Sequence, residues 1–317
     1  MRETRIWFIG SGPFAALCFT HMSEHLRFEK IVTGHPTKAG RGMKDRVSCV
    51  EQKALELGLS VERTGSLSQN GELLSALSDP PDIVFVVDFA QLIREPLLNA
   101  PRYGCLNIHP SLLPRWRGAA PIQRTLLNGD AVTGVTVFRL VEEMDAGPIL
   151  AQASVPAAPT VTAAELFDIL ALTGSQMAVQ GVESLIDSRC QFSSQNSEFA
   201  TYAAKLTKAE AQVSWNQDYR NIHNAVRAFN SSGGAFADVQ GKRLKLWKVS
   251  PVSREEIDSD EDLVIPGIVL YFMEGDPVVA CVGGALRLQE VQVEGKRRIS
   301  GADWACGGKL KKGGRLA

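Results

Sequence analysis

Residues 105–123 read Cys-Leu-Asn-Ile-His-Pro-Ser-Leu-Leu-Pro-Arg-Trp-Arg-Gly-Ala-Ala-Pro-Ile-Gln, and no other stretch of the chain combines so many unusual residues. Asn107 and His109 are separated by one residue, so on an extended strand their side chains point to the same face. Pro110 and Pro114 then prevent a regular element from continuing. An amide donor and a titratable imidazole on one face, directly before a loop, favour chemistry. The alternative is a basic surface loop that follows an edge strand.

The chain before this stretch has the pattern of an α/β domain. An apolar run from Ile6 to Ile9 leads through Gly10-Ser11-Gly12-Pro13 into residues 14–19, which are apolar enough for a buried helix. Strand, glycine turn and helix open a doubly wound α/β domain with a mostly parallel sheet, which we predict here. Further strands are expected at residues 30–33, 82–87, 106–109, 134–140 and 149–152, and helices at 50–57, 119–127 and 160–186, the last capped by Thr162.

The turn at Gly10-Ser11-Gly12 invites comparison with a dinucleotide-binding loop. The third glycine of that motif is missing, and Pro13 occupies the turn. No acidic residue follows the second strand at the spacing that a ribose contact requires. We therefore do not expect a dinucleotide here.

Residues 37–46 are predicted to form a glycine-rich loop with four basic residues and one acidic residue. Such a loop can wrap a polyanion, and phosphate contact is the interaction that its charge would support. Composition alone favours a solvated loop.

The chain changes character after residue 187. Residues 188–204 are polar and serine-rich, which is typical of a linker. A short amphipathic helix is expected at 219–229, followed by regular short strands with turn signals, which predict a small β-barrel. We predict a catalytic domain at 1–187, a linker at 188–207 and a barrel domain at 208–317. The barrel strands are expected at residues 235–239, 243–249, 267–272, 277–282 and 285–293.

Composition limits which binding partners and which cellular compartment we expect. The 317 residues carry a formal net charge of −1, so a nucleic acid or a membrane surface would have to meet a local patch. Residues 208–317 hold 16 Lys/Arg and 14 Asp/Glu, and the basic residues cluster, which makes the barrel a plausible nucleic-acid surface. The six scattered cysteines fit reduced thiols, with Cys105 read as a core thiol rather than a nucleophile. We expect a cytoplasmic monomer with no membrane segment and no metal.

Asn107, His109 and Asp145 are the candidate catalytic set. An amide and an imidazole on one strand face can donate to an oxygen, and an Asp in a turn fixed by Gly147 and Pro148 can hold the imidazole. This combination suits acyl or group transfer through a tetrahedral oxyanion. A serine hydrolase is excluded because no Gly-x-Ser-x-Gly elbow exists. A structural polar cluster is the main competing reading.

Residues 106–123 resemble the signature of the methionyl-tRNA formyltransferase family. Six further segments are similar to other parts of that family, so the resemblance covers nearly the whole chain. The Asn-x-His and Asp set is common to folate-dependent formyltransferases, and it therefore indicates the reaction better than the acceptor. The further segments are residues 8–15, 39–42, 133–136, 145–150, 205–208 and 227–230.

The resemblance implies a formyltransferase-type, Rossmann-like domain followed by an OB-like, tRNA-binding barrel. The donor would be 10-formyltetrahydrofolate, and the acceptor the α-amine of methionine esterified to initiator tRNA. Asn107 and His109 would stabilise the oxyanion, and Asp145 would orient His109 and assist proton removal. The folate pocket would be lined by Ser111, Leu112, Leu113, Pro114, Phe89 and Leu92, with the backbone of residues 88–92. The tRNA would be contacted by Arg41, Lys44, Lys245 and Arg297.

Three segments depart from the family pattern. Asp88-Phe89-Ala90 stands where the family has an Ala-Tyr-Gly-like loop, and a charged Asp88 would either reshape the pocket or face solvent. Residues 231–234 are Ser-Ser-Gly-Gly where Pro-Trp-Pro is usual, and Met43 and Asp45 interrupt the basic loop. Two other functions stay open. The same core would serve a sugar-nucleotide N-formyltransferase, and a non-catalytic RNA-binding protein would use only the basic barrel.

Overall fold

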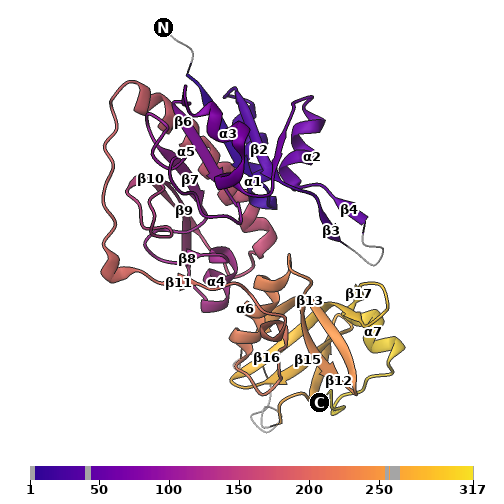
Figure 1. Cartoon of the computed structure of the whole chain (residues 1–317). Coiled ribbons are helices and arrows are strands. Elements are labelled where there is room, and N and C mark those ends of the chain that lie inside the picture. The colour runs from indigo at the N-terminus through magenta and orange to yellow at the C-terminus, as the bar shows by residue number, and fades with distance from the viewer. Residues whose placement is uncertain (1–3, 40–43, 254–256, 258–264, 317) are drawn as a thin grey trace. The chain divides into compact units, whose positions relative to one another are not determined.

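The computed structural model describes residues 4–39, 44–253, 257 and 265–316 (Figure 1). The chain divides into two compact units, which are described separately. The first unit comprises residues 1–121, 132–156 and 167–203. The second comprises residues 122–131, 157–166 and 204–317. In the part of the chain that the structure describes, no helix is long and apolar enough to cross a membrane.

The first unit is built on a seven-stranded sheet in the order β10-β9-β7-β6-β1-β2-β5. Strands β7, β6, β1, β2 and β5 run parallel to one another, and β9 runs antiparallel to both of its neighbours, β7 and β10. The strands are β1 Ile6–Gly10, β2 Lys30–Gly34, β5 Glu62–Thr64, β6 Ile83–Val87, β7 Cys105–His109, β9 Val132–Arg139 and β10 Ile149–Pro156. All residues of β1 and β6 are buried, as their continuous apolar runs require of strands covered on both faces.

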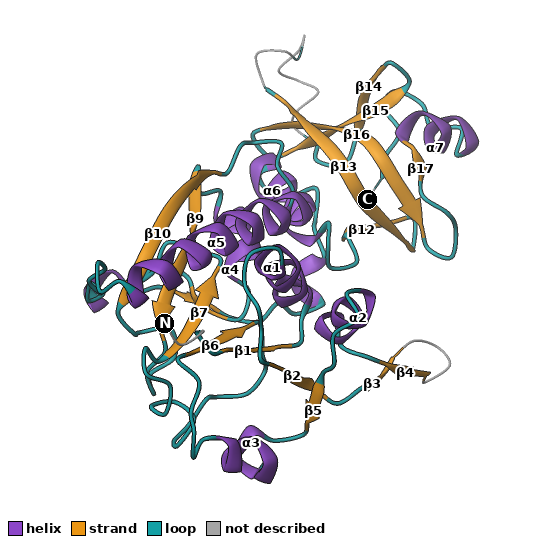
Figure 2. Ribbon diagram, turned by 90° about the horizontal axis from the view of Figure 1, so that it is seen from above, coloured by secondary structure: helices purple, strands orange, loops and turns teal. Residues whose placement is uncertain are grey.

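Helices cover both faces of this sheet, and Figure 2 shows α1 and α5 along one face and α3 on the other. Helix α5 packs closely, because a Cβ at Gly174 would lie 2.5 Å from Ile108 Cγ2 of β7. Thr162 and Glu165 form a reciprocal capping pair at the start of α5, as the sequence predicts. The helices are α1 Pro13–Ser23, α2 Cys49–Glu56, α3 Gly71–Ala76, α4 Pro121–Asn128 and α5 Ala163–Ile186, with a short 3₁₀ helix η1 at Leu67–Gln69.

The predicted loop at 37–46 contains secondary structure. Strands β3 Thr37–Ala39 and β4 Lys44–Arg46 pair in antiparallel fashion, with Lys38 opposite Asp45. The high glycine content suggested a loop over the whole segment, whereas a short hairpin needs only three paired residues at each end. Arg41 lies outside the described residues.

The second unit contains an antiparallel sheet in the order β12-β13-β16-β15-β14, with β17 paired to β16. Val252, Leu270 and Val278 are part of its core. The predicted class, a mostly parallel α/β sheet followed by a small antiparallel β domain, is confirmed. The elements are η3 Ala209–Ala211, α6 Tyr219–Phe229, β12 Ala235–Val239, β13 Lys242–Val252, β14 Val269–Met273, β15 Asp276–Cys281, β16 Gly284–Val293, β17 Ile299–Ser300 and α7 Gly301–Gly307.

The segment predicted as a linker is attached to the first unit. Strand β11 Tyr202–Ala203 pairs in parallel with β8 Arg117–Gly118, and Ser193 exchanges backbone hydrogen bonds with Ile149. A 3₁₀ helix η2 at Ser197–Phe199 lies between these two attachments. The polar composition that suggested a linker therefore belongs to a strip of chain that bridges to the edge strand β10 and then pairs with β8. The division into domains at residues 1–187 and 208–317, joined by a linker, stays a prediction.

Acid should destabilise the fold through His223 of α6. This residue is 8% exposed, and burial together with Arg227 lowers its pKa from 6.5 to about 4. Between these two pH values His223 is protonated in the unfolded chain but not in the folded one. The free energy of unfolding therefore falls as pH drops through this window, and above it His223 has no effect. We expect urea unfolding at pH 5 to show a loss on the order of 1 kcal/mol from this residue, relative to pH 7.

The matched variants are His223→Phe and His25→Phe, because His25 is exposed. His223→Phe should reduce the difference in unfolding free energy between pH 7 and pH 5, and His25→Phe should leave it as in the wild type. An equal pH dependence in all three proteins would exclude His223 as the source.

Candidate active site

The candidate donors Asn107 and His109 lie on strand β7, inside the seven-stranded sheet. Its register sets Asn107 opposite Phe138 and His109 opposite Thr136 of β9. The His109 ring meets the Phe138 ring edge-on, with 6.4 Å between the centroids, and His109 is 5% exposed. Asn107 is half-buried on the same strand face. The two predicted oxyanion donors are therefore held by pairing with β9, and the start of their strand is paired with β6 on the other side.

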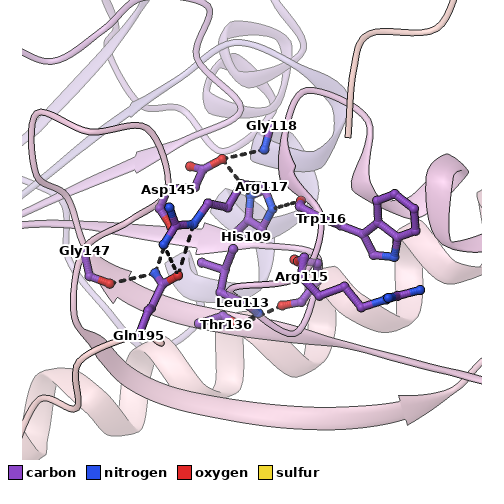
Figure 3. A network of polar contacts seen from close by, with 11 residues as sticks. His109, Leu113, Arg115, Trp116, Arg117, Gly118, Thr136, Asp145, Gly147 and Gln195 are labelled. Atoms are coloured by element: carbon purple, nitrogen blue, oxygen red, sulfur yellow. Dashed lines mark hydrogen bonds and ion pairs between the residues drawn. The ribbon is translucent and has the colours of Figure 1, made fainter. Parts of the chain in front are cut away.

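His109 is oriented by a backbone carbonyl (Figure 3). Its Nε2 donates to the carbonyl oxygen of Trp116 at 2.9 Å, and because a carbonyl only accepts, this nitrogen carries a proton. Its Nδ1 lies 3.8 Å from Asp145 Oδ2. The imidazole thus presents Nδ1 toward the carboxylate, which is close enough to stabilise a positive charge on the ring.

Asp145 lies in the turn between β9 and β10. Its φ of 52° is unusual for a residue other than glycine, and its Oδ2 accepts a hydrogen bond of 2.7 Å from Gly118 N. The turn depends on Gly147, where a Cβ would lie 1.7 Å from the carbonyl oxygen of Arg139. The predicted tight bend brings Asp145 to His109, so the structure assembles the candidate pair.

The turn after β7 is braced from two neighbouring strands. Ser111 Oγ donates to Arg115 O at 2.6 Å, which commits the hydroxyl to the turn itself. Thr136 Oγ1 donates to Ser111 O at 2.6 Å and accepts from Leu113 N at 3.1 Å. Gln152 Nε2 donates to Leu113 O at 2.9 Å. Ser111 therefore acts as a turn residue, as the sequence suggests, and not as a nucleophile.

The remaining predicted folate contacts lie on loops that follow adjacent strands. Residues 88–92 follow β6 and residues 110–114 follow its parallel neighbour β7, so both loops leave the same edge of the sheet. Phe89 packs against the core, Leu92 is 60% exposed, and Leu112 and Pro114 are half-buried. Together with Ser111 and Leu113, these four residues stay predicted folate contacts.

Cys105 is confirmed as a core thiol. It is fully buried on β7, its Sγ lies 3.4 Å from Leu97 O, and burial raises its pKa to about 12. A thiol that is hardly ever ionised is a poor nucleophile at neutral pH.

Arg115 and Arg117 have different environments. Arg115 is exposed and stacks over the Trp116 ring at 4.9 Å, whereas Arg117 is 1% exposed. Arg117 donates to Glu143 Oε1 at 2.9 Å and to Gln195 Oε1 at 2.9 and 3.3 Å. Arg117 therefore holds the site together rather than facing a substrate. Gln195 gave no signal in the sequence, because a single glutamine in a serine-rich stretch is unremarkable.

Comparison with known proteins decides the family. Residues 4–182 match the family model described as formyl transferase, and residues 205–309 match the one described as formyl transferase, C-terminal domain. The methionyl-tRNA formyltransferase of Thiobacillus denitrificans is 39% identical over 314 residues, which cover 98% of this chain and 99% of the relative. That of Aromatoleum aromaticum is 36% identical over 313 residues, 98% of this chain and 96% of the relative. The chain belongs to the methionyl-tRNA formyltransferase family.

Solved structures confirm the formyltransferase fold. HypX from Aquifex aeolicus, in complex with tetrahydrofolic acid, has a TM-score of 0.64 at 18% identity over 96% of this chain and 47% of that chain. This chain thus spans about half the length of HypX. An N-formyltransferase from Helicobacter canadensis, in complex with folinic acid and dTDP-3-aminofucose, has a TM-score of 0.63 at 16% identity, over 94% of this chain and 100% of that one. At such identities the likeness concerns the fold alone.

Asp88, which departs from the family pattern, contacts the start of α1. Its Oδ2 accepts from Phe14 N at 3.2 Å, and its carbonyl oxygen accepts from Gly12 N at 3.1 Å. Gly12 is required here, because a Cβ would lie 1.8 Å from Asp88 Oδ2. The carboxylate thus occupies the helix N-terminus where a dinucleotide-binding protein of this fold would hold pyrophosphate. A carboxylate at this position would repel a pyrophosphate, in line with the expectation that no dinucleotide binds here.

The predicted tRNA contacts of the second unit lie near an aromatic ring. Lys245 of β13 is half-buried with its Nζ 5.5 Å from the Trp247 ring, and Arg298 stacks on that ring at 3.7 Å. Arg297 is exposed between β16 and β17. Arg41 and the side chain of Lys44 lie outside what the structure describes, so all four contacts stay predictions.

Proposed function

We propose that this protein transfers the formyl group of 10-formyltetrahydrofolate to the α-amine of methionine esterified to initiator tRNA, and so supports the start of translation. The observation that carries the proposal is the pairing of His109 with Asp145 at 3.8 Å beside Asn107, in a chain whose near-full-length relatives are named methionyl-tRNA formyltransferases. The folate complexes of HypX and of the Helicobacter canadensis enzyme support a folate donor.

The residues of this chain suit acyl transfer between two amines. The donor supplies a formyl carbon bonded to nitrogen. When the methionyl amine attacks that carbon, Asn107 and His109 donate hydrogen bonds to the formyl oxygen as it becomes an oxyanion. Because Nε2 is committed to Trp116 O, His109 donates through Nδ1, which requires the protonated ring, and the Asp145 carboxylate stabilises that charge.

Proton balance completes the step. The attacking amine loses a proton, with Asp145 assisting, and the folate nitrogen gains one as its bond to carbon breaks, which leaves tetrahydrofolate and formylmethionyl-tRNA. No oxidant, reductant or metal is needed. One neutral amide and one imidazolium whose charge is balanced by a carboxylate fit a neutral formyl group, and they would be a poor match for the charged oxygens of a phosphoryl group.

Our proposal includes the parts of the chain that would meet each substrate. Residues 1–187 would carry the reaction, residues 188–207 would connect, and residues 208–317 would hold tRNA with Lys245 and Arg297. Arg41 and Lys44 would contact the acceptor arm. We propose a monomer acting in the cytoplasm.

The test is transfer of labelled formyl from 10-formyltetrahydrofolate to two acceptors, methionyl initiator tRNA and amino-sugar nucleotides. We expect labelled methionyl-tRNA and no labelled sugar. Transfer to the sugar alone would overturn the proposal in favour of a sugar-nucleotide N-formyltransferase, which two of the solved structures of this fold represent.

Arg41→Ala should mainly raise KM for tRNA. Loss of one charge-assisted phosphate contact should raise KM about tenfold, with kcat within about twofold of the wild type. The measurement is steady-state kinetics with tRNA varied at two salt concentrations, where the salt dependence should also fall by about one counterion. Lys53→Ala is the control, since Lys53 is a half-buried base on α2 that pairs with Glu56. An unchanged KM would remove residues 39–46 from tRNA recognition.

A further inference from the structure

Gln195 lies in the serine-rich strip that the sequence suggests is a linker. Gln195 is half-buried, whereas its neighbours Ser193, Ser194 and Asn196 are exposed. The strip is fixed on both sides of Gln195, by Ser193 to Ile149 and by β11 to β8. Its side chain is therefore delivered to the catalytic turn by backbone pairing.

The Gln195 carboxamide uses its full hydrogen-bonding capacity (Figure 3). Its Nε2 donates to Asp145 O and to Gly147 O, both at 2.8 Å. Its Oε1 accepts from Arg117 Nε at 3.3 Å and from a terminal guanidinium nitrogen of Arg117 at 2.9 Å. The orientation of the amide is fixed, because carbonyls only accept and a guanidinium only donates.

Asp145 is consequently held at both ends. Gln195 Nε2 donates a hydrogen bond to its backbone carbonyl, and Gly118 N donates one to its carboxylate at 2.7 Å. Gly118 directly follows Arg117, so one short strand and one amide side chain together define where the carboxylate lies. The left-handed backbone of Asp145 costs free energy, and such a conformation persists only where its surroundings enforce it.

We infer that Gln195 is a positioning residue for formyl transfer, which holds Asp145 at its place beside His109 by gripping the carbonyls of Asp145 and Gly147. This inference rests on the proposed function for its kinetic readout. The competing explanation is structural: Gln195 would serve only to pair the buried guanidinium of Arg117.

Two substitutions separate these explanations. Gln195→Glu keeps an acceptor for Arg117 but removes both donors to the carbonyls, whereas Gln195→Ala removes both functions. If Gln195 positions Asp145, both variants should lose about 10- to 100-fold in kcat, with KM for folate and for tRNA within about twofold of the wild type. Only Gln195→Ala should lower the thermal midpoint clearly, because only there does the buried Arg117 guanidinium lose the Gln195 acceptor and keep Glu143 alone. Ser194→Ala is the control and should match the wild type.

Amide hydrogen exchange gives a readout that does not depend on turnover. The Gly118 amide donates to the Asp145 carboxylate, so its exchange should accelerate in both Gln195 variants and stay unchanged in Ser194→Ala. Wild-type kcat in Gln195→Glu, or a loss of kcat with unchanged Gly118 exchange, would overturn the inference. A wild-type protein without formyl transfer would overturn the proposed function instead, and Gly118 exchange would still test the positioning.

Discussion

Replacing His109 with Ala should lower formyl-transfer turnover by about 10²–10⁴, with the secondary structure retained. The imidazole is the group at the site that can both donate to an oxyanion and carry a compensating charge, and Asp145 lies 3.8 Å from its Nδ1. The loss should appear in kcat, since the interaction forms in the transition state. The measurement is single-turnover formyl transfer with saturating tRNA and folate donor.

His109→Gln makes this test specific to chemistry. A glutamine can keep a donor for the carbonyl of Trp116, to which Nε2 donates at 2.9 Å, but it cannot carry the charge that Asp145 stabilises. Its thermal midpoint should lie nearer the wild type than that of His109→Ala, while its turnover stays low. His25→Ala, on an exposed site, should be fully active. Full turnover in both His109 variants would exclude His109 from the reaction, whereas tRNA binding without any turnover in the wild type would support a non-catalytic RNA-binding protein.

The sequence predicted the fold wherever local pattern and tertiary structure agree. The apolar run 83–87 became the central strand β6, and the helix predicted at 219–229 has the observed bounds of α6. Asn107 and His109 share a strand face because strand geometry fixes side-chain alternation. Asp145 was found because glycine and proline mark its turn, although its approach to His109 depends on the pairing of β7 with β9.

What the sequence could not supply is contact between distant polar residues. Nothing in the local pattern near residue 195 indicates that an amide there meets Arg117, which lies 78 positions away. Asp88 looked like a change to the folate loop or a solvated charge, yet its carboxylate contacts the start of α1, 74 positions away in sequence. Such contacts depend on which strands become neighbours, and a hydrophobic pattern encodes that only indirectly.

Replacing Asn107 with Ala is expected to reduce turnover by about 10²–10³. The amide is neutral in every state, so its contribution is one donor aimed at the oxygen that becomes negative. Strand β7 is paired by β6 and β9, which keeps this donor in place before the substrate arrives. The loss of a preorganised donor lowers kcat and leaves ground-state binding nearly unchanged. KM for folate should therefore stay within about twofold of the wild type.

Asn107→Asp tests the sign of the interaction. The carboxylate has the shape of the amide but no N–H donor, and its charge repels a developing oxyanion, so turnover should fall at least as far as in Asn107→Ala. Asn99→Ala removes an exposed amide from the same unit and should leave kcat unchanged. If Asn107→Asp retained more activity than Asn107→Ala, the side chain would fill space rather than stabilise charge, and the oxyanion would depend on His109 alone.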